Sequence, residues 1–336
     1  MTADATLDLS ALTDWLDSNE VPGSGEPVTT RALTGGTTNV VFHLSRGGHE
    51  FVLRMSPTGM STRAGTTMLR EYTVLRALHG TDVPCARAWA LCPDPAVLGS
   101  PFYVMDYIEG WSPAASDDWP APFDVDPSAR RGLATELIEA IARLSRVDWQ
   151  SRGLADFGHP EDFHDRQVDR WLAQFADVRF RALPGLEEAA TWLRANRPRD
   201  WSPGIMHGDY QFANVMFAHG APARLVAIID WELSTIGDPL LDLAWVLMSA
   251  DWNAAKFDLS GLPSHAELIE QYRRSSGRSV ADIDYYLILA RFKMAVILEG
   301  GYARSRNDPR HARSAGFGAI SLDLAARAGA MAVSYG

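Results

Sequence analysis

The chain has 336 residues, and its 31 basic and 42 acidic side chains give a formal charge of −11. With 46% apolar residues and two cysteines, the composition excludes a disordered chain, a collagen and a disulfide scaffold, and the acidic balance argues against a nucleic-acid partner. The length favours one large or two linked domains, and no apolar stretch reaches the roughly 18 residues of a membrane span, so no membrane partner is expected.

The first hundred residues combine helical and strand patterns, which predict a small α+β lobe. Two helices are expected, over residues 7–20 and 66–79. The second has Met68, Tyr72 and Leu75 at helical spacing and ends before Gly80. Strands are expected at 28–33, 39–45, 50–55 and 102–108.

The rest of the chain is predicted to be mainly helical after a loop at 111–124 that is rich in Pro, Ala, Ser and Asp. Helices are expected at 127–147, 161–196, 264–275, 280–300 and 317–334. Two short strands, 214–217 and 225–230, stand among them. Asp238 and Pro239 then open a further helix as its N-cap and first residue.

Three oxygen-bearing side chains in the middle of the chain suit phosphoryl transfer. Asp209 follows His207 and Gly208, Asn214 comes five residues after Asp209, and Asp230 comes 21 residues after it. The reaction needs oxygen ligands for a cation and a separate carboxylate that orients the attacking hydroxyl. We therefore expect Asn214 and Asp230 to bind Mg²⁺ and Asp209 to act as the catalytic base. Taken alone, a His-Gly-Asp tripeptide is more often a turn.

The segment 207–214 resembles the H-G-D-x-x-x-x-N catalytic loop of the aminoglycoside phosphotransferase and choline kinase superfamily, which are protein-kinase-like small-molecule kinases. Residues 237–244 read Gly-Asp-Pro-Leu-Leu-Asp-Leu-Ala and resemble the G-D-P-x-x-D-L-A signature of the same superfamily. The resemblance implies an α+β, bilobal protein-kinase-like fold. Its small β-rich N-terminal lobe would span 1–108 with a hinge at 105–108, and its larger, mainly helical C-terminal lobe would span 109–336.

The resemblance also implies roles for neighbours of the catalytic loop. His207 would orient the loop, and Asp242 would brace it through hydrogen bonds. Asp238 is expected to be an N-cap rather than a catalytic group.

Arg54 stands at the strand position where a kinase carries its phosphate-binding lysine, and the chain has no lysine before Lys256. An arginine keeps its charge and can bind phosphate oxygens through its fork of donors. Strand alternation places Val52 on the same face as Arg54. Glu71, close to the buried stripe of the helix 66–79, is the expected ion-pair partner of Arg54.

Gly35 and Gly36 resemble the reduced glycine-rich loop of this superfamily, whose backbone N–H groups would cover the phosphates. By themselves, two adjacent glycines between strands more often form a hairpin turn. Only their position ahead of Arg54 supports the phosphate role.

The hinge is expected to pair with the adenine ring through its backbone, with Asp106 and Ile108 as contact residues. Val52 would lie above the ring, and Met216 and Ile229 below it. The same three apolar side chains also suit an ordinary core, so this alternative stays open.

The implied activity is transfer of the γ-phosphoryl group from ATP, or another nucleoside triphosphate, to a hydroxyl of a small molecule, with Mg²⁺ as cofactor. The Val-Leu-Arg strand and the Arg-Glu-Tyr helix resemble the branch of kinase-like domains fused to acyl-CoA dehydrogenases. This branch favours a hydroxyacyl or other hydroxylated metabolite as acceptor, including a CoA thioester. Arginines around the acceptor would fit such an ester.

An aminoglycoside is the alternative acceptor, because the acidic charge and the acids Asp117, Asp118 and Asp124 would suit a cationic ligand. A catalytically silent nucleotide-binding protein is a second alternative, motivated by the missing lysine. A metal-dependent hydrolase is a third, although it leaves the β-rich lobe without a purpose. No oligomeric state is predicted.

Cys85 and Cys92 do not form a C-x-x-C pair and predict two reduced thiols. The first twenty residues carry five acidic and no basic side chains, the reverse of a secretory or transit leader. A cytoplasmic location is therefore expected.

Overall fold

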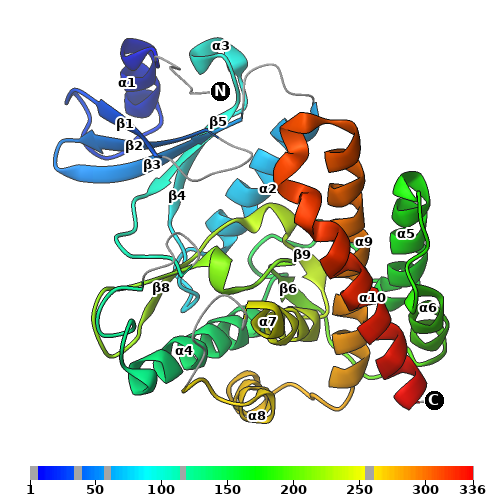
Figure 1. Ribbon diagram of the computed structural model, residues 1–336. Helices are drawn as coiled ribbons and strands as arrows, with labels where there is room; N and C mark the ends of the chain where they lie inside the picture. Colours follow the sequence, from blue (N-terminus) through cyan, green and yellow to red (C-terminus); the bar gives the residue numbers. More distant parts are fainter. Residues whose placement is uncertain (1–6, 34–39, 57–61, 114–118, 254–260, 336) are drawn as a thin grey trace. The chain divides into compact units, whose positions relative to one another are not determined.

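The computed structural model describes residues 7–33, 40–56, 62–113, 119–253 and 261–335, which group into two compact units (Figure 1). Unit 1 takes in Met1–Arg143, Val147–Phe157 and Phe212–Ser234. Unit 2 takes in Leu144–Arg146, Gly158–Gln211 and Thr235–Gly336. Unit 1 therefore joins the predicted N-terminal lobe to the segment that carries Asn214 and Asp230. The predicted lobe boundary after residue 108 stays a prediction.

Unit 1 contains a five-stranded antiparallel sheet in the order β1-β2-β3-β5-β4. Its strands are β1 (Thr29–Leu33), β2 (Val40–Arg46), β3 (His49–Met55), β4 (Ala88–Cys92) and β5 (Phe102–Asp106). The four predicted strands agree with this sheet to within two residues. The sequence did not predict β4, because Ala-Trp-Ala-Leu-Cys contains no β-branched residue.

The remaining elements of unit 1 are helices and a small hairpin. They are α1 (Leu9–Ser18), α2 (Thr62–Leu78), α3 (Pro95–Leu98), α4 (Pro127–Arg146, its last three residues grouped with unit 2), the hairpin β7 (Val215–Phe217) and β8 (Leu225–Ile228), and the 3-10 turns η1 (Phe212–Asn214) and η2 (Trp231–Leu233).

One face of the sheet forms a hydrophobic core with α1. Leu12 and Leu16 of α1 join Phe51, Leu53 and Met55 of β3 in one buried cluster. Burying a side chain of this size stabilises the fold by roughly 1.5–3 kcal/mol. The alternate residues of β3 lie on the opposite face of the strand, as the sequence predicted.

Unit 2 is mainly helical. Its elements are α5 (Phe163–Val178), α6 (Leu186–Ala195), β6 (Gly204–Met206), β9 (Thr235–Gly237), α7 (Leu240–Asn253), α8 (His265–Ser276), α9 (Ile283–Asn307), η3 (Pro309–Gly316) and α10 (Phe317–Ser334). Strands β6 and β9 pair antiparallel, so the chain segments before the catalytic loop and before α7 lie side by side.

The predicted single helix over 161–196 is wrong, because the structure has two helices, α5 and α6. Pro184 and Gly185 separate them, and Gly185 adopts a φ of +90° that L side chains rarely take. A Cβ at this position would also clash with the carbonyl of Ala325. The helical periodicity continues across the break, which explains why the pattern alone did not reveal it.

One helical segment within the described ranges, Pro309–Ser334, is long and apolar enough to cross a bilayer by length and composition. Asp323 and Arg327 interrupt it, which is why no apolar run of this length was expected from the sequence. In unit 2, α10 packs against α9 and α6, and its Leu324 and Ala325 are buried. The absence of a membrane partner stays a prediction.

Both cysteines are free thiols, as predicted. Burial raises the pKa of the Cys85 thiol to about 12, and it also raises the pKa of Cys92. Thiolate is the reactive form of cysteine, so neither group has the character of a nucleophile.

Candidate active site

An ion pair in unit 1 joins β3 to α2. Arg54 donates from Nη2 to Oε1 of Glu71 at 2.8 Å, which confirms the predicted pair. The hydroxyl of Tyr103, the residue opposite Arg54 on β5, donates to Oε2 of Glu71 at 2.9 Å. The Glu71 side chain is 1% exposed and the Arg54 side chain 15%. Both oxygens of the carboxylate are therefore bound, which fixes α2 against the sheet.

The protonation of this cluster reflects its burial. Desolvation raises the pKa of Glu71 to about 7, despite the opposing effects of Arg54 and of the Tyr103 hydrogen bond. Burial acts to lower the pKa of Arg54, but Tyr103, Glu71 and Asp230 together raise it above its ordinary value. Arg54 thus stays cationic, whereas Glu71 is expected to titrate near neutral pH.

Glu71 should make the stability of the fold depend on pH. Its pKa rises from 4.5 to about 7 on folding, so its contribution is complete below about pH 4.5 and is lost as the pH rises through about 7. In the Glu71→Gln variant, residue 71 is neutral at every pH. The free energy of unfolding of this variant should therefore fall less than that of the parent protein as the pH rises from about 4.5 to above 7. Denaturant titrations at a series of pH values measure the difference. Glu161→Gln, at an exposed position, is the control, and parallel curves for parent and Glu71→Gln would refute the assignment.

The β7–β8 hairpin places the two predicted metal ligands at one end. The backbone N–H of Ile229 donates to the carbonyl of Asn214 at 3.0 Å, and Asp230 follows directly. Asp230 adopts a φ of +66°, a conformation that is rare for a residue with a side chain. Its Oδ1 accepts from Nη2 of Arg54 at 3.0 Å. The structure therefore brings Arg54, Glu71 and Asp230 into direct contact.

Carboxylates gather around Asp230. Carboxylate oxygens of Glu71, Asp230 and Glu232 lie within 4.8 Å of one another. Asn214 lies at the same end of the hairpin as Asp230 and is 9% exposed. Carboxylate and amide oxygens are the ligands that Mg²⁺ prefers, so the residues present fit this cation. The individual ligand roles stay predictions.

Part of the predicted hinge, residues 105–108, forms hydrogen bonds with neighbouring segments of the sheet. The N–H of Asp106 donates to the carbonyl of Arg87 at 2.9 Å, and its carboxylate accepts from Nε1 of Trp89 at 2.6 Å. The side chain and amide of Asp106 thus hold β5 to β4. An adenine ring would have to use other backbone groups of this segment, such as those of Ile108 beyond the strand end.

The other predicted nucleotide contacts differ in exposure. Val52 is buried, whereas Met216 and Ile229 are half-buried. Gly35 and Gly36 lie outside the described residues. The contact of these residues with a nucleotide stays a prediction.

Arg70, next to Glu71 on α2, ties this helix to the segment after Asp230. Its Nη2 donates to the carbonyl of Ser234 at 2.7 Å and to that of Phe157 at 2.8 Å. Its guanidinium also lies 4.3 Å from the centre of the Phe157 ring. Two consecutive side chains of α2 therefore bind two different parts of unit 1.

Residues 207–211 of the catalytic loop lie in unit 2, where Asp242 braces them. Carboxylate oxygens of Asp242 accept the N–H of His207 at 2.6 Å and that of Gly208 at 2.9 Å, as predicted. Gly208 adopts a φ of +86°, which favours glycine at this turn. Asp238 accepts the N–H two residues further on at 3.0 Å, which confirms its capping role.

Asp209 is held by two donors within unit 2. Nε1 of Trp245, on α7, donates to Oδ1 of Asp209 at 2.8 Å, and Nε2 of Gln211 donates to the same oxygen at 2.9 Å. Hydrogen bonds to a carboxylate are strong and directional, so they fix the orientation of the group. The side chain is half-buried, which leaves it accessible to a reactant.

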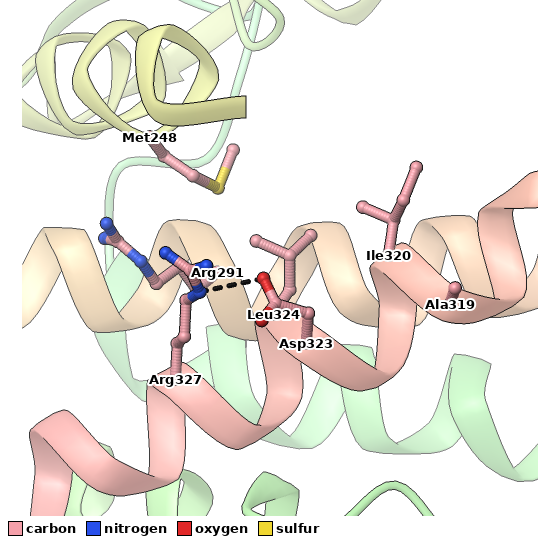
Figure 2. Close-up of a pocket in the computed structure, with 7 residues that line it drawn as sticks. All are labelled: Met248, Arg291, Ala319, Ile320, Asp323, Leu324 and Arg327. Atoms are coloured by element: carbon pink, nitrogen blue, oxygen red, sulfur yellow. Dashed lines mark ion pairs between the residues drawn. The ribbon is translucent and has the colours of Figure 1, made fainter. Parts of the chain in front are cut away.

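A pocket of about 320 Å³ lies between α7, α9 and α10 of unit 2 (Figure 2). Its lining residues are Met248, Arg291, Ala319, Ile320, Asp323, Leu324 and Arg327. Figure 2 shows Met248 on one side and Ile320 on the other, with the two arginines toward one end. Arg327 pairs with Asp323 at 2.8 Å. The volume is in the range of small-ligand pockets, roughly 300–1,000 Å³.

Several residues of these clusters were not predicted from the sequence. Glu232 comes two residues after Asp230, and Trp245 comes three residues after Asp242 on one helix, so local spacing could have indicated both. Tyr103 pairs opposite Arg54 only because β3 and β5 are neighbours in the sheet. That contact has no signal in the local sequence.

Comparison with known proteins identifies the family. The model of the phosphotransferase enzyme family matches residues 29–279. Acyl-CoA dehydrogenase family member 11 of Gallus gallus is 34% identical over 291 residues, which are 82% of this chain and 37% of that protein. The chain thus spans little more than a third of the length of this curated relative. The resemblance to the branch found with acyl-CoA dehydrogenases is confirmed.

Solved structures agree with the predicted fold. A protein from Ralstonia eutropha, described as a candidate aminoglycoside phosphotransferase, is 30% identical with a TM-score of 0.84, covering 98% of this chain and 99% of that one. A thermostable mutant of an aminoglycoside phosphotransferase, in ternary complex with AMP-PNP and hygromycin B, has a TM-score of 0.55 and 16% identity over 96% of this chain and 99% of that one. This last likeness shows the fold alone. The chain therefore belongs to the phosphotransferase enzyme family and has a kinase-like α+β fold.

Proposed function

We propose that the chain transfers the γ-phosphoryl group of Mg²⁺-bound ATP to a hydroxyl of a hydroxyacyl or similar hydroxylated metabolite. The observation that carries the donor half is the contact of Arg54 with both Glu71 and Asp230 in one unit. An arginine held by two carboxylates and placed beside oxygen ligands is suited to binding phosphate oxygens. A catalytically silent kinase would be expected to lack one of Asp209, Asn214 and Asp230, and this chain has all three.

The residues of unit 1 would hold the nucleotide and its cation. Asn214 and Asp230 would bind Mg²⁺ through oxygen, and Arg54 would donate to the phosphates. Bound Mg²⁺ and ATP would supply the phosphoryl group and neutralise its negative charge. The complex of a structural neighbour with AMP-PNP supports ATP as the donor.

Asp209 would accept the proton that the acceptor hydroxyl loses. The hydrogen bonds from Trp245 and Gln211 to Oδ1 orient its carboxylate for this task. Positioning of this kind, more than covalent chemistry, is what phosphoryl transfer asks of an enzyme.

The pocket of unit 2 supports an anionic acceptor. Its described lining holds two arginines and one acid, and Arg291 is 8% exposed. A guanidinium largely removed from water favours an anionic ligand nearby, whereas a cationic aminoglycoside would be repelled. Met248 lies one helical turn after Trp245, so the pocket begins next to the residue that binds Asp209.

An acceptor screen tests this proposal. ATP consumption should rise with hydroxyacyl-CoA thioesters such as 3-hydroxybutyryl-CoA, and it should not rise with hygromycin B. Phosphorylation of hygromycin B alone would reverse the proposed acceptor class. Absence of Mg²⁺-dependent ATP consumption with every acceptor would favour the silent alternative.

Substitutions that change the charge of the pocket provide a second test, in which the direction of the change in KM is measured. Arg327→Met should raise the KM for an anionic acceptor by roughly tenfold, as loss of one charge-assisted contact predicts. Asp323→Asn, which removes the opposite charge from the same ion pair, should lower that KM or leave it unchanged. Arg274→Met, on the exposed side of α8, is the control. Opposite shifts of the two KM values would indicate a cationic acceptor.

A further inference from the structure

Lys293 is a buried ammonium in the middle of α9 that the proposed mechanism does not yet use. It is 8% exposed, and its Nζ donates to the carbonyl of Gly208 at 3.1 Å. The same Nζ lies 4.5 Å from the ring centre of Trp245 and 5.5 Å from that of Trp171. Such cation–π contacts stabilise a charge that has left water. Lys293 and Lys256 are the two lysines of the chain.

Lys293 and Asp242 bind opposite sides of the same glycine. Asp242, from α7, accepts the N–H of Gly208 at 2.9 Å, while Lys293, from α9, donates to its carbonyl. The residue that precedes Asp209 is therefore held by two helices at once. Loss of either contact would leave a buried backbone group without that partner and loosen the loop.

Trp245 links Lys293 to the carboxylate itself. Its ring face meets the ammonium, and its Nε1 donates to Oδ1 of Asp209 at 2.8 Å. The side chain of Lys293 thus reaches Asp209 by two routes, through the Gly208 backbone and through the indole. Both routes lie within unit 2.

The charged groups that face Lys293 come from three elements. Asp242 lies on α7, Asp209 on the catalytic loop and Arg170 on α5, and His207 of the loop faces Asp242. Burial lowers the pKa of Lys293 to about 8, against the attraction of Asp242 and Asp209 and with the repulsion of Arg170. The ammonium of Lys293 is therefore expected to lose its proton at mildly alkaline pH.

We propose that Lys293 is a positioning residue, which holds the Asp209 carboxylate in its working orientation through Gly208 and Trp245. The inference rests on the proposed role of Asp209 as the base. Because the ammonium form makes these contacts, activity should fall when Lys293 loses its charge. Asp209 and Lys293 should also affect each other's protonation, since their charges interact.

The small number of lysines allows a direct measurement of this coupling. In protein labelled with ¹³C-lysine, NMR should show two side-chain signals, assigned with Lys293→Met and Lys256→Met. The Lys293 signal should titrate near pH 8, and Asp209→Asn should shift that midpoint to lower pH because a nearby negative charge is removed. A Lys293 midpoint near the ordinary value of about 10.4, or one unmoved by Asp209→Asn, would overturn the proposal.

Acceptor-free hydrolysis of Mg²⁺-bound ATP provides the kinetic test. The parent rate should fall above about pH 8. Lys293→Met should lower kcat by roughly tenfold or more, remove the alkaline limb and leave the KM for ATP unchanged within about twofold. Lys256→Met should keep the parent profile. A merely structural lysine would change the melting temperature and leave the shape of the pH profile intact.

Trp245→Phe leaves Lys293 in place, so its own loss of kcat tests the indole route if Lys293→Met folds poorly, and a double-mutant cycle of the two tests whether they act together. Trp245→Phe keeps an aromatic face for the ammonium and removes the N–H that binds Asp209. If the two residues act on one carboxylate, the double variant should be no slower than the slower single variant. Additive losses would contradict a shared route. If Asp209→Asn loses hydrolysis while Lys293→Met keeps the parent rate and pH profile, the proposed role of Lys293 is wrong and that of Asp209 stands. If Asp209→Asn keeps full activity, the assignment of Asp209 as the base is wrong.

Discussion

Replacing Asp209 by asparagine should reduce turnover by roughly 10²–10⁴-fold, the range that general-base catalysis contributes. The asparagine keeps an oxygen that can accept from Trp245 and Gln211, so the loop geometry should survive. What it loses is the capacity to take the acceptor proton. Affinity for an ATP analogue should stay within about twofold, because the proposed nucleotide site is built from residues of unit 1.

Steady-state rates with the acceptor found in the screen, and titration with AMP-PNP, measure the two effects separately. Gln211→Glu is unsuitable as a control because it would add a charge beside Asp209. Glu161→Gln, an exposed carboxylate-to-amide change, serves instead. Full activity in Asp209→Asn would mean that another group takes the proton.

Replacing Arg54 by methionine should damage both stability and nucleotide binding. The change removes the cationic partner of Glu71, whose side chain is 1% exposed. Breaking a buried pair in this way costs about 3–5 kcal/mol, because an uncompensated charge stays buried. The loss should be smaller at pH 6 than at pH 8.5, since Glu71, with a pKa raised to about 7, takes up a proton more readily at the lower value.

Two companion variants separate the effects of Arg54. Arg54→Met/Glu71→Gln carries no buried charge at either position, so it should regain much of the stability and none of the affinity for an ATP analogue. Arg54→Lys restores the side chain usual in the superfamily and should retain binding within roughly tenfold, because an ammonium keeps the charge but lacks the guanidinium fork. Thermal melts and analogue titrations distinguish these results. Wild-type nucleotide affinity in Arg54→Met would exclude a phosphate contact by this residue.

The parts of the site that the sequence predicted are those with local spacing. Asp209 and Asn214 share one loop, and Asp242 lies in a recognisable helix start. The pair of Arg54 and Glu71 was expected from the resemblance to kinases, and strand alternation and helical periodicity agreed with the face on which each lies. Patterns of this kind depend on a few neighbouring residues. The structure contains the expected Arg54–Glu71 ion pair and the hydrogen bonds of Asp242 to the loop, whereas the roles of Asp209 and Asn214 stay predictions.

Contacts between distant segments were not predictable in the same way. Lys293 meets Gly208 across 85 positions in the chain, and nothing in the sequence around Lys293 indicates that it contacts this loop. The break between α5, which ends at Val178, and α6, which begins at Leu186, was hidden by continuing periodicity. The grouping of Phe212–Ser234 with the sheet-bearing unit depends on tertiary packing alone.

The adjacent residues Arg70 and Glu71 give α2 a mechanical consequence. Glu71 links the helix to Arg54 on the sheet, and Arg70 links it to the carbonyl of Ser234 just beyond the turn that follows Asp230. A rotation of α2 large enough to release one link strains the other. The position of Arg54 and that of the segment after Asp230 are thus both linked to α2, so a substitution that shifts this helix should displace both.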